Sequence, residues 1–535
     1  MTSSVPKLAR CVMVLGTTSG AGKSWLTTAL CRWYANQGLK VVPFKAQNMS
    51  NNARVVPTPS GGMGEIGSAQ YFQALAARAE PEVRMNPLLL KPEADTRSQV
   101  VLMGEVDREL TEAPWRGRSE RVWPHIAKAL DALRAENDVM VIEGAGSPAE
   151  INLYDSDVVN MRVARHASAA CLLVTDIDRG GAFAHLYGTW ALLPEADRAL
   201  FKGFVLNKFR GDASLLAPAP QMLQELTGIP TVATIPMIRH HGLPEEDGVF
   251  NDAPTLGASA PALPPEGALI ALGRPGGGEG DASTLGVQAI ARGLTVAVIA
   301  YPRISNLDEF QPLKNVPGVR LVWARSPSEV AGADWIILPG SKSTVADLAW
   351  LRAQGLDGAV CAHAEQGGLV LGICGGLQML GEAVVDPQGV EGEGGNAPGL
   401  GLLPLVTAFE RQKRVCRTEA TFSKLKAGPW QALEGLQAGG YEIHNGQTRE
   451  HPAMAAKGDR LHAVLHSADG TALGWQSHAG HVLGVYLHGL LEHPVFLRAL
   501  FGTAGADLQQ VFDRLAADVE HAFTPNTLHN LLGTP

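Results

Sequence analysis

Hydrophobic residues in the first half of the chain occur as short, continuous runs, separated by longer stretches in which apolar residues recur at helical spacing. A continuous apolar run bounded by turn residues is typical of a strand buried on both faces of a parallel sheet. Six such runs predict strands, at residues 11–15, 41–44, 139–142, 170–175, 203–206 and 231–235.

The stretch after the first run predicts an amphipathic helix. Its apolar residues follow the spacing of one helix face, and they are Leu26, Ala29, Leu30, Trp33 and Tyr34. We expect Gly38 to end this helix, because glycine readily adopts the left-handed conformation that follows helix C-termini. Strands that alternate with helices predict a doubly wound α/β domain over residues 1–250.

The pattern changes after this domain. Residues 251–293 are rich in Ala, Pro and Gly, which predicts a linker. A second alternation of apolar runs and amphipathic stretches predicts another α/β domain over residues 294–500, followed by a C-terminal helical tail, 501–535. The strands expected in this domain are 295–300, 320–323, 335–338, 369–371 and 481–485. The expected fold class is therefore α/β, with two doubly wound domains.

Length and composition fit this organisation. The chain has 535 residues, too many for one hydrophobic core. Its formal net charge is −9 and no block of like charges stands out, which argues against partners such as nucleic acid or a membrane surface. No apolar run is long enough to span a bilayer. The six cysteines lack C-x-x-C spacing, so we expect neither disulfides nor a zinc site, and a reducing cytoplasm fits.

Residues 14–24, Val-Leu-Gly-Thr-Thr-Ser-Gly-Ala-Gly-Lys-Ser, predict a phosphate-binding loop. In such a loop, glycines let backbone N–H groups converge on phosphate oxygens at a helix N-terminus. Lys23 would supply a positive charge, and the Ser24 hydroxyl is a candidate ligand for Mg²⁺. The other candidate nucleotide-binding residues of the loop are Gly16, Thr17, Gly20 and Gly22. The loop is one residue longer than the common G-x-x-x-x-G-K-[ST] pattern, and it is similar to that of dethiobiotin synthetase-like amidoligases.

Polar residues follow several predicted strands, where a doubly wound sheet places its ligands. Glu143 is a candidate Mg²⁺ ligand, and Lys45 is placed to neutralise a phosphate. Asp176 and Asp178 are candidates for binding metal or substrate, and Asn207 for hydrogen bonding to a nucleotide base. For each of the five, a solvated side chain at a strand end is the alternative interpretation.

A cysteine in a glycine-rich turn marks a second candidate site. Cys374 follows a buried run and precedes two glycines, which permits a sharp strand-to-helix turn that exposes the thiol. The helix N-terminus behind it favours the thiolate. The N–H groups of Gly375 and Ser341 are candidate oxyanion donors, and His488, at the end of another run, is the candidate base. An inert buried thiol is the alternative interpretation.

These residues resemble the triad-type glutamine amidotransferases. In that family an acid usually lies two residues after the histidine, but this chain has Leu490 there. Glu492 is the nearest carboxylate in the sequence. Two possibilities follow from this departure: an acid that orients His488 differently, or a Cys–His dyad.

Longer motifs narrow the resemblance. They are residues 43–49 (PFKAQNM), 64–67 (GEIG), 86–92 (NPLLLKP), 143–153 (EGAGSPAEINL), 176–181 (DIDRGG), 207–212 (NKFRGD), 243–247 (LPEED), 302–306 (PRISN) and 441–446 (YEIHNG). In these motifs the chain resembles cobyric acid synthase over nearly its whole length, apart from the linker.

The resemblance implies an ATP- and glutamine-dependent ligase of adenosylcobalamin biosynthesis. Members of this family amidate the b, d, e and g carboxylates of adenosylcobyrinic acid a,c-diamide. The implied cofactors are ATP and Mg²⁺, and the implied partners are that corrinoid and L-glutamine. Cys374 and His488 match the glutaminase residues of the family, and His444, in residues 441–446, is a candidate for binding substrate or metal. The sequence leaves the oligomeric state open.

Two alternatives stay open at this point. The nearer one is cobyrinic acid a,c-diamide synthase, which performs the same chemistry on other carboxylates. The other is a partitioning-type switch ATPase that binds partners and carries a relic glutaminase domain.

Overall fold

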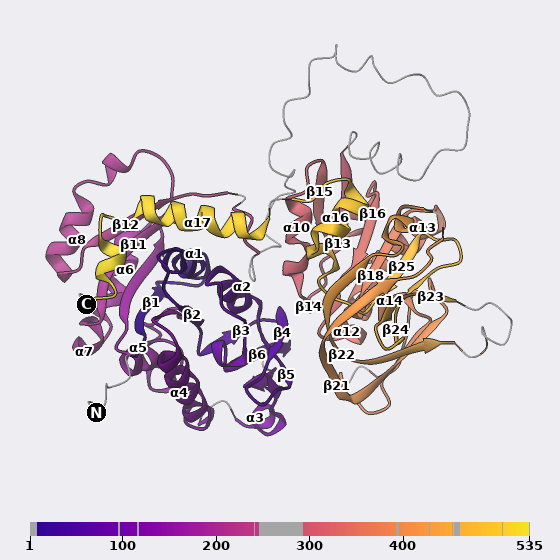
Figure 1. Ribbon diagram of the computed structural model, residues 1–535, viewed down its shortest axis with the longest axis horizontal. Coiled ribbons are helices and arrows are strands. Elements are labelled where there is room, and N and C mark those ends of the chain that lie inside the picture. Colours follow the sequence, from indigo (N-terminus) through magenta and orange to yellow (C-terminus); the bar gives the residue numbers. More distant parts are fainter. Residues whose placement is uncertain are drawn as a thin grey trace, which may run out of the picture. The chain divides into compact units, whose positions relative to one another are not determined.

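In the computed structural model, the chain divides into two compact units (Figure 1). Unit 1 comprises Met1–Leu243 and Asp507–Pro535, and unit 2 comprises Pro244–Ala506. The structure describes residues 8–94, 97–114, 117–239, 241–244, 293–391, 395–426, 428–451, 453, 461–505 and 507–533. The predicted linker, 251–293, lies outside the described residues apart from its last position.

Unit 1 is built on a sheet of six parallel strands in the order β12-β11-β10-β1-β9-β2. The strands are β1 (Arg10–Gly16), β2 (Val41–Phe44), β9 (Val139–Glu143), β10 (Ala170–Asp176), β11 (Phe201–Phe209) and β12 (Thr231–Pro236). All six predicted strands are confirmed, with shifted ends. Their continuous apolar runs reflect burial on both faces: Val12 to Leu15 of β1 are fully buried.

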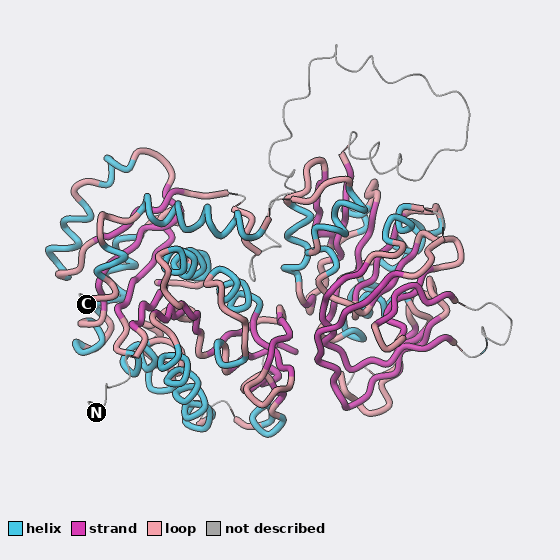
Figure 2. Tube along the Cα trace, in the orientation of Figure 1, coloured by secondary structure: helices cyan, strands magenta, loops and turns pink. Residues whose placement is uncertain are grey.

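Helices cover both faces of this sheet, as Figures 1 and 2 show. The helices packed against one face are α4 (Arg118–Glu136), α5 (Met161–Ala167) and α6 (Ala182–Ala191). Those against the other face are α1 (Lys23–Asn36), α2 (Ser68–Ala76) and α17 (Leu508–Ala522). The predicted first helix is therefore confirmed, and Gly38 follows it with a φ of 78°. Shorter helices of unit 1 are α3 (Arg108–Glu112), α7 (Glu195–Arg198), α8 (Ala219–Thr227) and α18 (Thr527–Asn530).

Two small sheets lie between β2 and α4 in the sequence. One has the order β3-β6-β7-β8 and the other pairs β4 with β5. Their strands are β3 (Gln47–Met49), β4 (Ala53–Pro57), β5 (Met63–Gly67), β6 (Leu88–Ala94), β7 (Arg97–Leu102) and β8 (Glu105–Val106). These strands were not predicted, because polar, charged or glycine residues interrupt their apolar residues.

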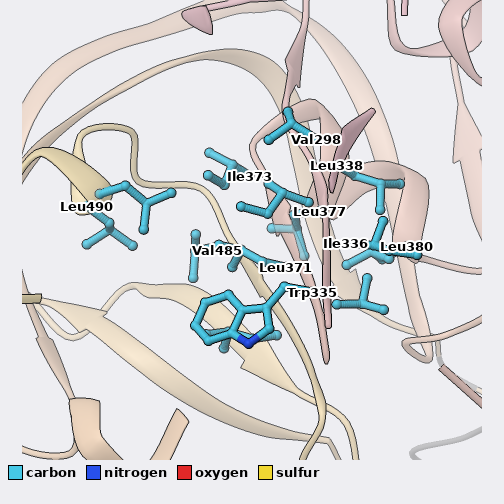
Figure 3. Close-up of a cluster of buried hydrophobic side chains, with 14 of the residues drawn as sticks. Val298, Trp335, Ile336, Leu338, Leu371, Ile373, Leu377, Leu380, Val485 and Leu490 are labelled. Atoms are coloured by element: carbon cyan, nitrogen blue, oxygen red, sulfur yellow. The ribbon is translucent and has the colours of Figure 1, made fainter. Parts of the chain in front are cut away.

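Unit 2 contains a mixed sheet with a parallel part and an antiparallel part. The parallel part has the order β15-β13-β16-β18-β25 and matches the predicted strands. Its members are β13 (Leu294–Ile299), β15 (Val319–Ala324), β16 (Trp335–Leu338), β18 (Leu369–Ile373) and β25 (Val482–Val485). Figure 3 shows Leu371, Ile373 and Val485 from these strands packed around Trp335 and Leu377.

The antiparallel part extends this sheet beyond β25, and among its described residues only the pairing of β19 with β21 is parallel. Its strands are β19 (Ala383–Val385), β20 (Ala397–Pro398), β21 (Leu405–Phe422), β22 (Gln437–Glu450), β23 (His462–Ser467) and β24 (Ala472–Gln476). A separate two-stranded pair joins β14 (Ile304–Ser305) to β17 (Gly340–Ser341). The helices of unit 2 are α10 (Gln311–Lys314), α11 (Pro327–Val330), α12 (Thr344–Ala353), α13 (Leu356–Glu365), α14 (Gly375–Leu380) and α16 (Pro494–Phe501).

The predicted C-terminal tail, 501–535, is divided differently in the structure. Helix α16 ends at Phe501 within the core of unit 2, whereas the chain from Asp507 onward belongs to unit 1. There α17 buries its apolar face beside α1. The tail therefore completes the first domain rather than following the second. In the part of the chain that the structure describes, no helix is both long and apolar enough to cross a membrane.

Candidate active sites

The predicted phosphate loop connects β1 to α1. Gly20 and Gly22 have φ values of 72° and 100°, in the left-handed region that glycine tolerates. The Lys23 ammonium bends back over the loop and donates to the carbonyl oxygens of Thr18 (3.0 Å) and Gly146 (3.1 Å). A side chain at Gly16 would press on Lys23, because an added Cβ would lie 3.0 Å from its Cδ. The loop and its lysine thus have the geometry of a phosphate cradle.

The loop is also held by β10 and β11, the next two strands on one side of β1 in the sheet. Thr17 donates its N–H to the carbonyl of Val174 (2.9 Å), and its hydroxyl lies 3.0 Å from that of Thr175. Asn207 donates to the carbonyl of Ala21 (2.9 Å). A Cβ on Gly22 would lie 1.9 Å from the Asn207 amide nitrogen, so this position requires glycine. In the structure, Asn207 positions the loop, whereas its predicted contact with a base stays a prediction.

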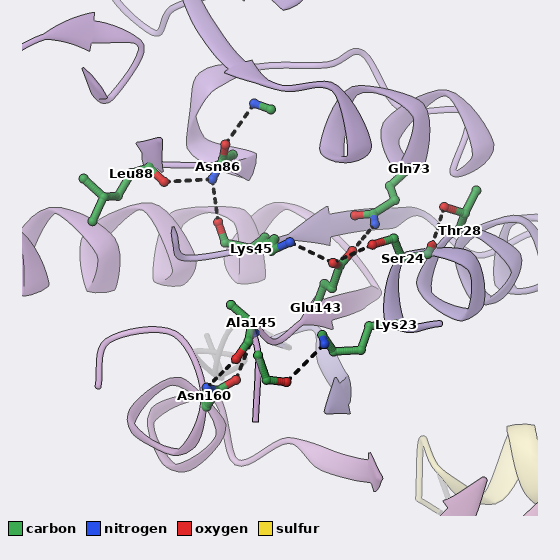
Figure 4. A network of polar contacts seen from close by, with 12 residues as sticks. Lys23, Ser24, Thr28, Lys45, Gln73, Asn86, Leu88, Glu143, Ala145 and Asn160 are labelled. Atoms are coloured by element: carbon green, nitrogen blue, oxygen red, sulfur yellow. Dashed lines mark hydrogen bonds and ion pairs between the residues drawn. The ribbon is translucent and has the colours of Figure 1, made fainter. Parts of the chain in front are cut away.

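Glu143, at the end of β9, is the centre of a buried polar cluster (Figure 4). Its Oε1 accepts hydrogen bonds from the Ser24 hydroxyl and the Lys45 ammonium, both at 2.8 Å. Its Oε2 accepts from the Gln73 amide at 2.5 Å. Burial alone would raise the pKa of Glu143, but the charge of Lys45 and these three hydrogen bonds lower it below its ordinary value. The carboxylate is therefore ionised where the phosphate loop meets the sheet.

The predicted residues Ser24 and Lys45 thus both contact the predicted Glu143, and Gln73 of α2 contacts the same carboxylate. Sequence reasoning missed Gln73 because it lies on a helix 70 residues before Glu143, with no strand end or glycine turn to mark it. The only available signal is that polar Ser68, Gln70 and Gln73 interrupt an otherwise apolar helix, and all three are fully buried.

Asp176 and Asp178 lie at the end of β10 and just beyond it. Asp176 is buried and contacts Lys208 (3.1 Å) and Arg179 (3.4 Å). Asp178 is half-buried and forms an ion pair with Arg210. Lys208 also donates to the carbonyl of Gly20 in the phosphate loop (2.9 Å), so Asp176 is linked to the loop through this lysine. A direct role for either carboxylate in binding metal or substrate stays a prediction.

Cys374 occupies the turn between β18 and α14. Its φ of 51° and ψ of −105° are strained for a residue with a side chain. Such strain is typical of a nucleophile at the tip of a strand-to-helix turn. The turn is held by a hydrogen bond from the Cys374 N–H to the Val485 carbonyl (2.8 Å). It also needs the glycine behind it, because a Cβ on Gly376 would lie 1.8 Å from the Leu338 carbonyl oxygen.

His488 follows β25, and Cys374 is among the groups that shift the pKa of its ring. The Nδ1 atom of His488 lies 3.0 Å from the Glu309 carboxylate, and the ring stacks on Tyr441 with centroids 5.3 Å apart. Both members of the His488–Glu309 pair are fully buried. Burial alone would lower the pKa of His488, but the negative charges of Glu309 and of a Cys374 thiolate raise it to about 10. Glu309 therefore orients His488 and stabilises its protonated form, as the acid of a catalytic triad does.

Glu309 is the principal residue that sequence reasoning missed. It lies in a short 3-10 helix, Leu307–Phe310, which is 179 positions before the histidine. Its second oxygen accepts a hydrogen bond from the N–H of Gly489 (3.1 Å), which fixes the carboxylate. The sequence analysis considered an acid close to the histidine in the sequence, such as Glu492, or a Cys–His dyad without an acid. A weak signal existed, since Glu309 lies three residues after the end of the PRISN motif at residues 302–306.

The candidate oxyanion donors lie together. A Cβ built on Gly375 would be 2.7 Å from the backbone nitrogen of Ser341, so the two predicted N–H groups come from adjoining segments. The Ser341 hydroxyl donates to Asp347 (2.6 Å) and accepts from the N–H of Ser343 (3.1 Å). Burial raises the pKa of Asp347 to about 7. This contact anchors the loop that would supply the second donor.

His444 lies in unit 2, on the strand that passes Cys374. The thiol is 3.7 Å from the Ile443 carbonyl oxygen, one residue before His444. The His444 ring nitrogens contact the Glu442 carboxylate (3.1 Å) and the Gly446 carbonyl (2.9 Å). Burial would raise the pKa of Glu442, but hydrogen bonds from His444 and Thr418 help to lower it to about 2. His444 is thus placed beside the cysteine site, whereas no group of three metal-binding side chains occurs among the described residues.

The two units match two known families of domains. Residues 12–245 match the CobQ/CobB/MinD/ParA nucleotide binding domain, and residues 295–496 match the CobB/CobQ-like glutamine amidotransferase domain. A cobyric acid synthase of Polaromonas sp. is 69% identical over 99% of each chain. That of Paracidovorax citrulli is 69% identical over 97% of this chain and 98% of its own, and that of Variovorax paradoxus is 67% identical over 98% and 99%.

The chain belongs to the cobyric acid synthase family. Unit 1 is accordingly its nucleotide-binding domain and unit 2 its glutamine amidotransferase domain. The match of near full length to cobyric acid synthases favours this interpretation over a cobyrinic acid a,c-diamide synthase and over a partitioning-type ATPase.

Proposed function

We propose that the protein uses ATP and glutamine to amidate carboxylates of a corrinoid acid, namely the b, d, e and g carboxylates of adenosylcobyrinic acid a,c-diamide. One observation carries the proposal. A single chain of the cobyric acid synthase family holds both a phosphate loop with its Glu143 cluster and a buried Cys374–His488–Glu309 constellation. The first suits phosphoryl transfer from ATP, and the second suits release of ammonia from an amide.

In unit 1 the chemical problem is activation of a carboxylate, whose leaving group would otherwise be oxide. Transfer of the γ-phosphoryl group of ATP makes an acyl phosphate, which ammonia can attack. Lys23 and the N–H groups of the phosphate loop would stabilise the negative charge that develops on the transferring group. Lys45, buried beside Glu143, would place a second positive charge there.

The donor set in unit 1 also fits Mg²⁺. The Ser24 hydroxyl and the Glu143 carboxylate are hard oxygen donors 2.8 Å apart at the N-terminus of α1. Mg²⁺ is usually bound by one or two carboxylates together with phosphates and waters, so a larger cluster of acids is not needed. When bound, the ion would neutralise charge on the phosphates. Gln73 would keep the second oxygen of Glu143 engaged and so fix the direction of the first.

In unit 2 Cys374 would attack the side-chain carbonyl of glutamine and form a thioester. The N–H groups of Gly375 and Ser341 would bind the oxyanion of the tetrahedral intermediate. His488, oriented by Glu309, would protonate the departing ammonia and later deprotonate the water that cleaves the thioester. Free ammonia is mostly protonated at neutral pH, and ammonium cannot attack the acyl phosphate. Hydrolysis of glutamine would therefore supply unprotonated ammonia that free ammonium provides only at high concentration.

The decisive experiment follows the substrate by mass. The full-length protein is incubated with ATP, Mg²⁺, glutamine and candidate corrinoid acids, and mass spectrometry counts the hydroxyl groups replaced by amino groups. We expect four replacements on adenosylcobyrinic acid a,c-diamide, each dependent on ATP. The absence of amidation on every corrinoid acid would overturn the proposal. ATP cleavage that responds to DNA or a protein, and not to corrinoid, would instead favour the partitioning-type ATPase.

A further inference from the structure

A cavity of about 320 Å³ in unit 1 adjoins the phosphate loop. Ser19 of that loop and Gly146, after β9, form part of its wall. The carbonyl oxygen of Gly146 accepts a hydrogen bond from Lys23 (3.1 Å). A residue of the cavity wall is thus in direct contact with the lysine that we expect at the γ-phosphate. The cavity therefore adjoins the place where phosphoryl transfer would occur.

The walls of this cavity are mainly apolar. Leu88 and Leu90 of β6, Val122 of α4 and Leu153 are among the apolar lining residues. Polar side chains line the cavity as well, among them Gln47, Ser147, the Arg118 guanidinium and the carboxylates of Glu150 and Asp157. A lining whose exposed surface is more apolar than polar suits an organic ligand rather than a nucleotide phosphate or an ion.

The mouth of the cavity exposes large apolar side chains to solvent. Met49 is 52% exposed and Leu153 is 46% exposed, and both line the cavity. Ile151, two residues from Leu153 on the same loop, is 64% exposed. Exposing apolar side chains to water is unfavourable, so a ligand that covers the side chains at the mouth of a cavity lowers the free energy of the complex. This group, Met49, Ile151 and Leu153, is called the apolar rim.

We propose that this cavity and its apolar rim bind the corrinoid acid, with the apolar ring against the rim and one carboxylate arm inside, directed toward Lys23. The inference rests on the proposed function. The volume is suited to an arm and one edge of the ring, and it is too small for the whole macrocycle. Arg118, whose guanidinium donates to the Ala113 carbonyl (2.7 Å), adds a positive charge to the wall that attracts carboxylate arms.

The apolar character of the rim also fits the repeated reaction. If one phosphoryl donor serves four carboxylates of one ring, the ring must bind in four orientations. Directional hydrogen bonds would favour one of these orientations over the others. Contact between apolar surfaces depends on area and has little directional preference, so it can be similar in all four. A rim of flexible Met49 and exposed aliphatic side chains meets this need.

The test replaces rim residues with polar residues of similar shape, as Met49→Gln and Leu153→Asn. Matched controls are Met222→Gln and Leu226→Asn on α8, where the native side chains are 56% and 66% exposed and lie outside the cavity lining. Equilibrium dialysis with adenosylcobyrinic acid a,c-diamide, followed by its visible absorbance, gives the Kd. We expect each rim variant to raise the Kd about tenfold, the effect of losing one buried apolar contact. ATP binding, glutaminase turnover and melting temperature should not change.

The outcomes separate this inference from the proposed function. If the wild type binds and amidates the corrinoid while the rim variants keep its Kd, the corrinoid site is elsewhere and only the inference is overturned. Equal weakening in the α8 controls would overturn it as well. If the wild type neither binds nor amidates any corrinoid acid, the proposed function fails, and the inference fails with it.

Discussion

His488 illustrates at the scale of single residues how a buried group acquires its chemistry. Its pKa is raised to about 10 because two negative partners outweigh the effect of burial. Since the folded-state pKa lies above the unfolded value of about 6.5, this stabilisation is complete below pH 6.5 and is lost as the pH rises toward 10. Between those limits the imidazolium is available to donate a proton to departing ammonia.

The first prediction concerns Glu309→Gln. The variant keeps the shape of the side chain but removes the charge, so the pKa of His488 should fall and its ring should lose its fixed orientation. Glutaminase kcat should drop by about 10²-fold or more, as in triads whose acid is made neutral. In the pH profile of glutaminase kcat/KM, the limb that reports loss of the His488 proton should move to a lower pH. Amidation with high ammonium should be spared.

Glu492→Gln is the matched control for this prediction, since Glu492 is the carboxylate nearest to His488 in the sequence. It should retain glutaminase activity close to that of the wild type. If Glu492→Gln were the inactive variant and Glu309→Gln the active one, the assignment of the acid in the triad would be wrong.

The contrast between the two glutamates shows which site residues a sequence reveals. Cys374 and His488 are recognisable because glycines and buried runs beside them fix the local backbone. Glu309 acts across 179 positions, and its contact depends on how the fold brings a 3-10 turn to the end of β25. Gln73 was missed for the same reason, because neither residue belongs to a pattern with a period or a conventional spacing.

The second prediction concerns Glu143→Gln. An amide keeps an acceptor for Ser24 and Lys45 but binds Mg²⁺ far more weakly than a carboxylate does. Titration of Mg²⁺ against corrinoid-dependent ATP cleavage should show a midpoint raised by at least tenfold. The melting temperature should fall as well, because buried Lys45 loses its charged partner. Glu120→Gln, whose native carboxylate forms an exposed ion pair with Arg162, is the control and should leave the midpoint unchanged.

An unchanged Mg²⁺ midpoint in Glu143→Gln, with an unchanged rate, would remove Glu143 from the metal site. Asp176 would then be the better candidate, because it is buried and linked to the phosphate loop through Lys208.

At the scale of elements, the packing of α17 on α1 joins the C-terminus to the helix that carries the phosphate loop. Arg32 of α1 is 2% exposed and donates to Asp513 (2.7 Å) and to the side chain of Gln509 (2.7 Å) on α17. Tyr34 donates to the carbonyl of Leu528 (2.8 Å). Because α1 begins at the phosphate loop, α17 restrains the element that positions Lys23.

The third prediction is that Arg32→Met destabilises unit 1. The variant preserves the apolar stem but leaves polar groups of α17 without their partner, which should cost about 2 kcal/mol. Thermal unfolding would be followed with and without ATP. Arg121→Met is the control, since its ion pair with Glu109 is exposed and should contribute close to nothing. Equal melting temperatures for the two variants would show that α17 does not support α1.

Elements differed in how well the sequence predicted them. The parallel strands of both sheets were found because burial on both faces leaves a continuous apolar run. Strands β21 and β22 were not, since polar residues dominate β21 from Glu410 to Arg414 and several side chains there are exposed. These two strands pair with each other over most of their length, and β21 also pairs with β23. Since pairing with other strands stabilises them, their own sequences carry no clear strand pattern.

At the scale of the whole molecule, each unit has its own hydrophobic core. A large cluster of buried residues belongs to unit 2, and two large clusters on opposite faces of the parallel sheet belong to unit 1. The loop of Lys23 is built only from elements of unit 1, and the Cys374 site only from elements of unit 2. A substitution in one site should therefore leave the fold of the other intact.

The fourth prediction uses this separation. Cys374→Ser should abolish glutamine-dependent amidation, because a serine hydroxyl is a far weaker nucleophile than a thiolate at neutral pH. Amidation with high ammonium should continue at near the wild-type rate. Lys23→Ala should stop amidation with either nitrogen source, since it removes a charge that stabilises the transferring phosphoryl group by several kcal/mol in comparable sites. Glutamine hydrolysis should persist in that variant.

The two variants are measured together, by mass of the corrinoid product and by glutamate release. Cys361→Ser is the control for the cysteine, because Cys361 lies on α13, away from the turn at Cys374. Equal loss of amidation by Cys374→Ser with glutamine and with ammonium would contradict the model of two sites. So would amidation by Lys23→Ala at the wild-type rate with ammonium. We expect Cys374→Ser to lose only the use of glutamine and Lys23→Ala to lose only amidation. That result would show that ammonia released in unit 2 is the species consumed in unit 1.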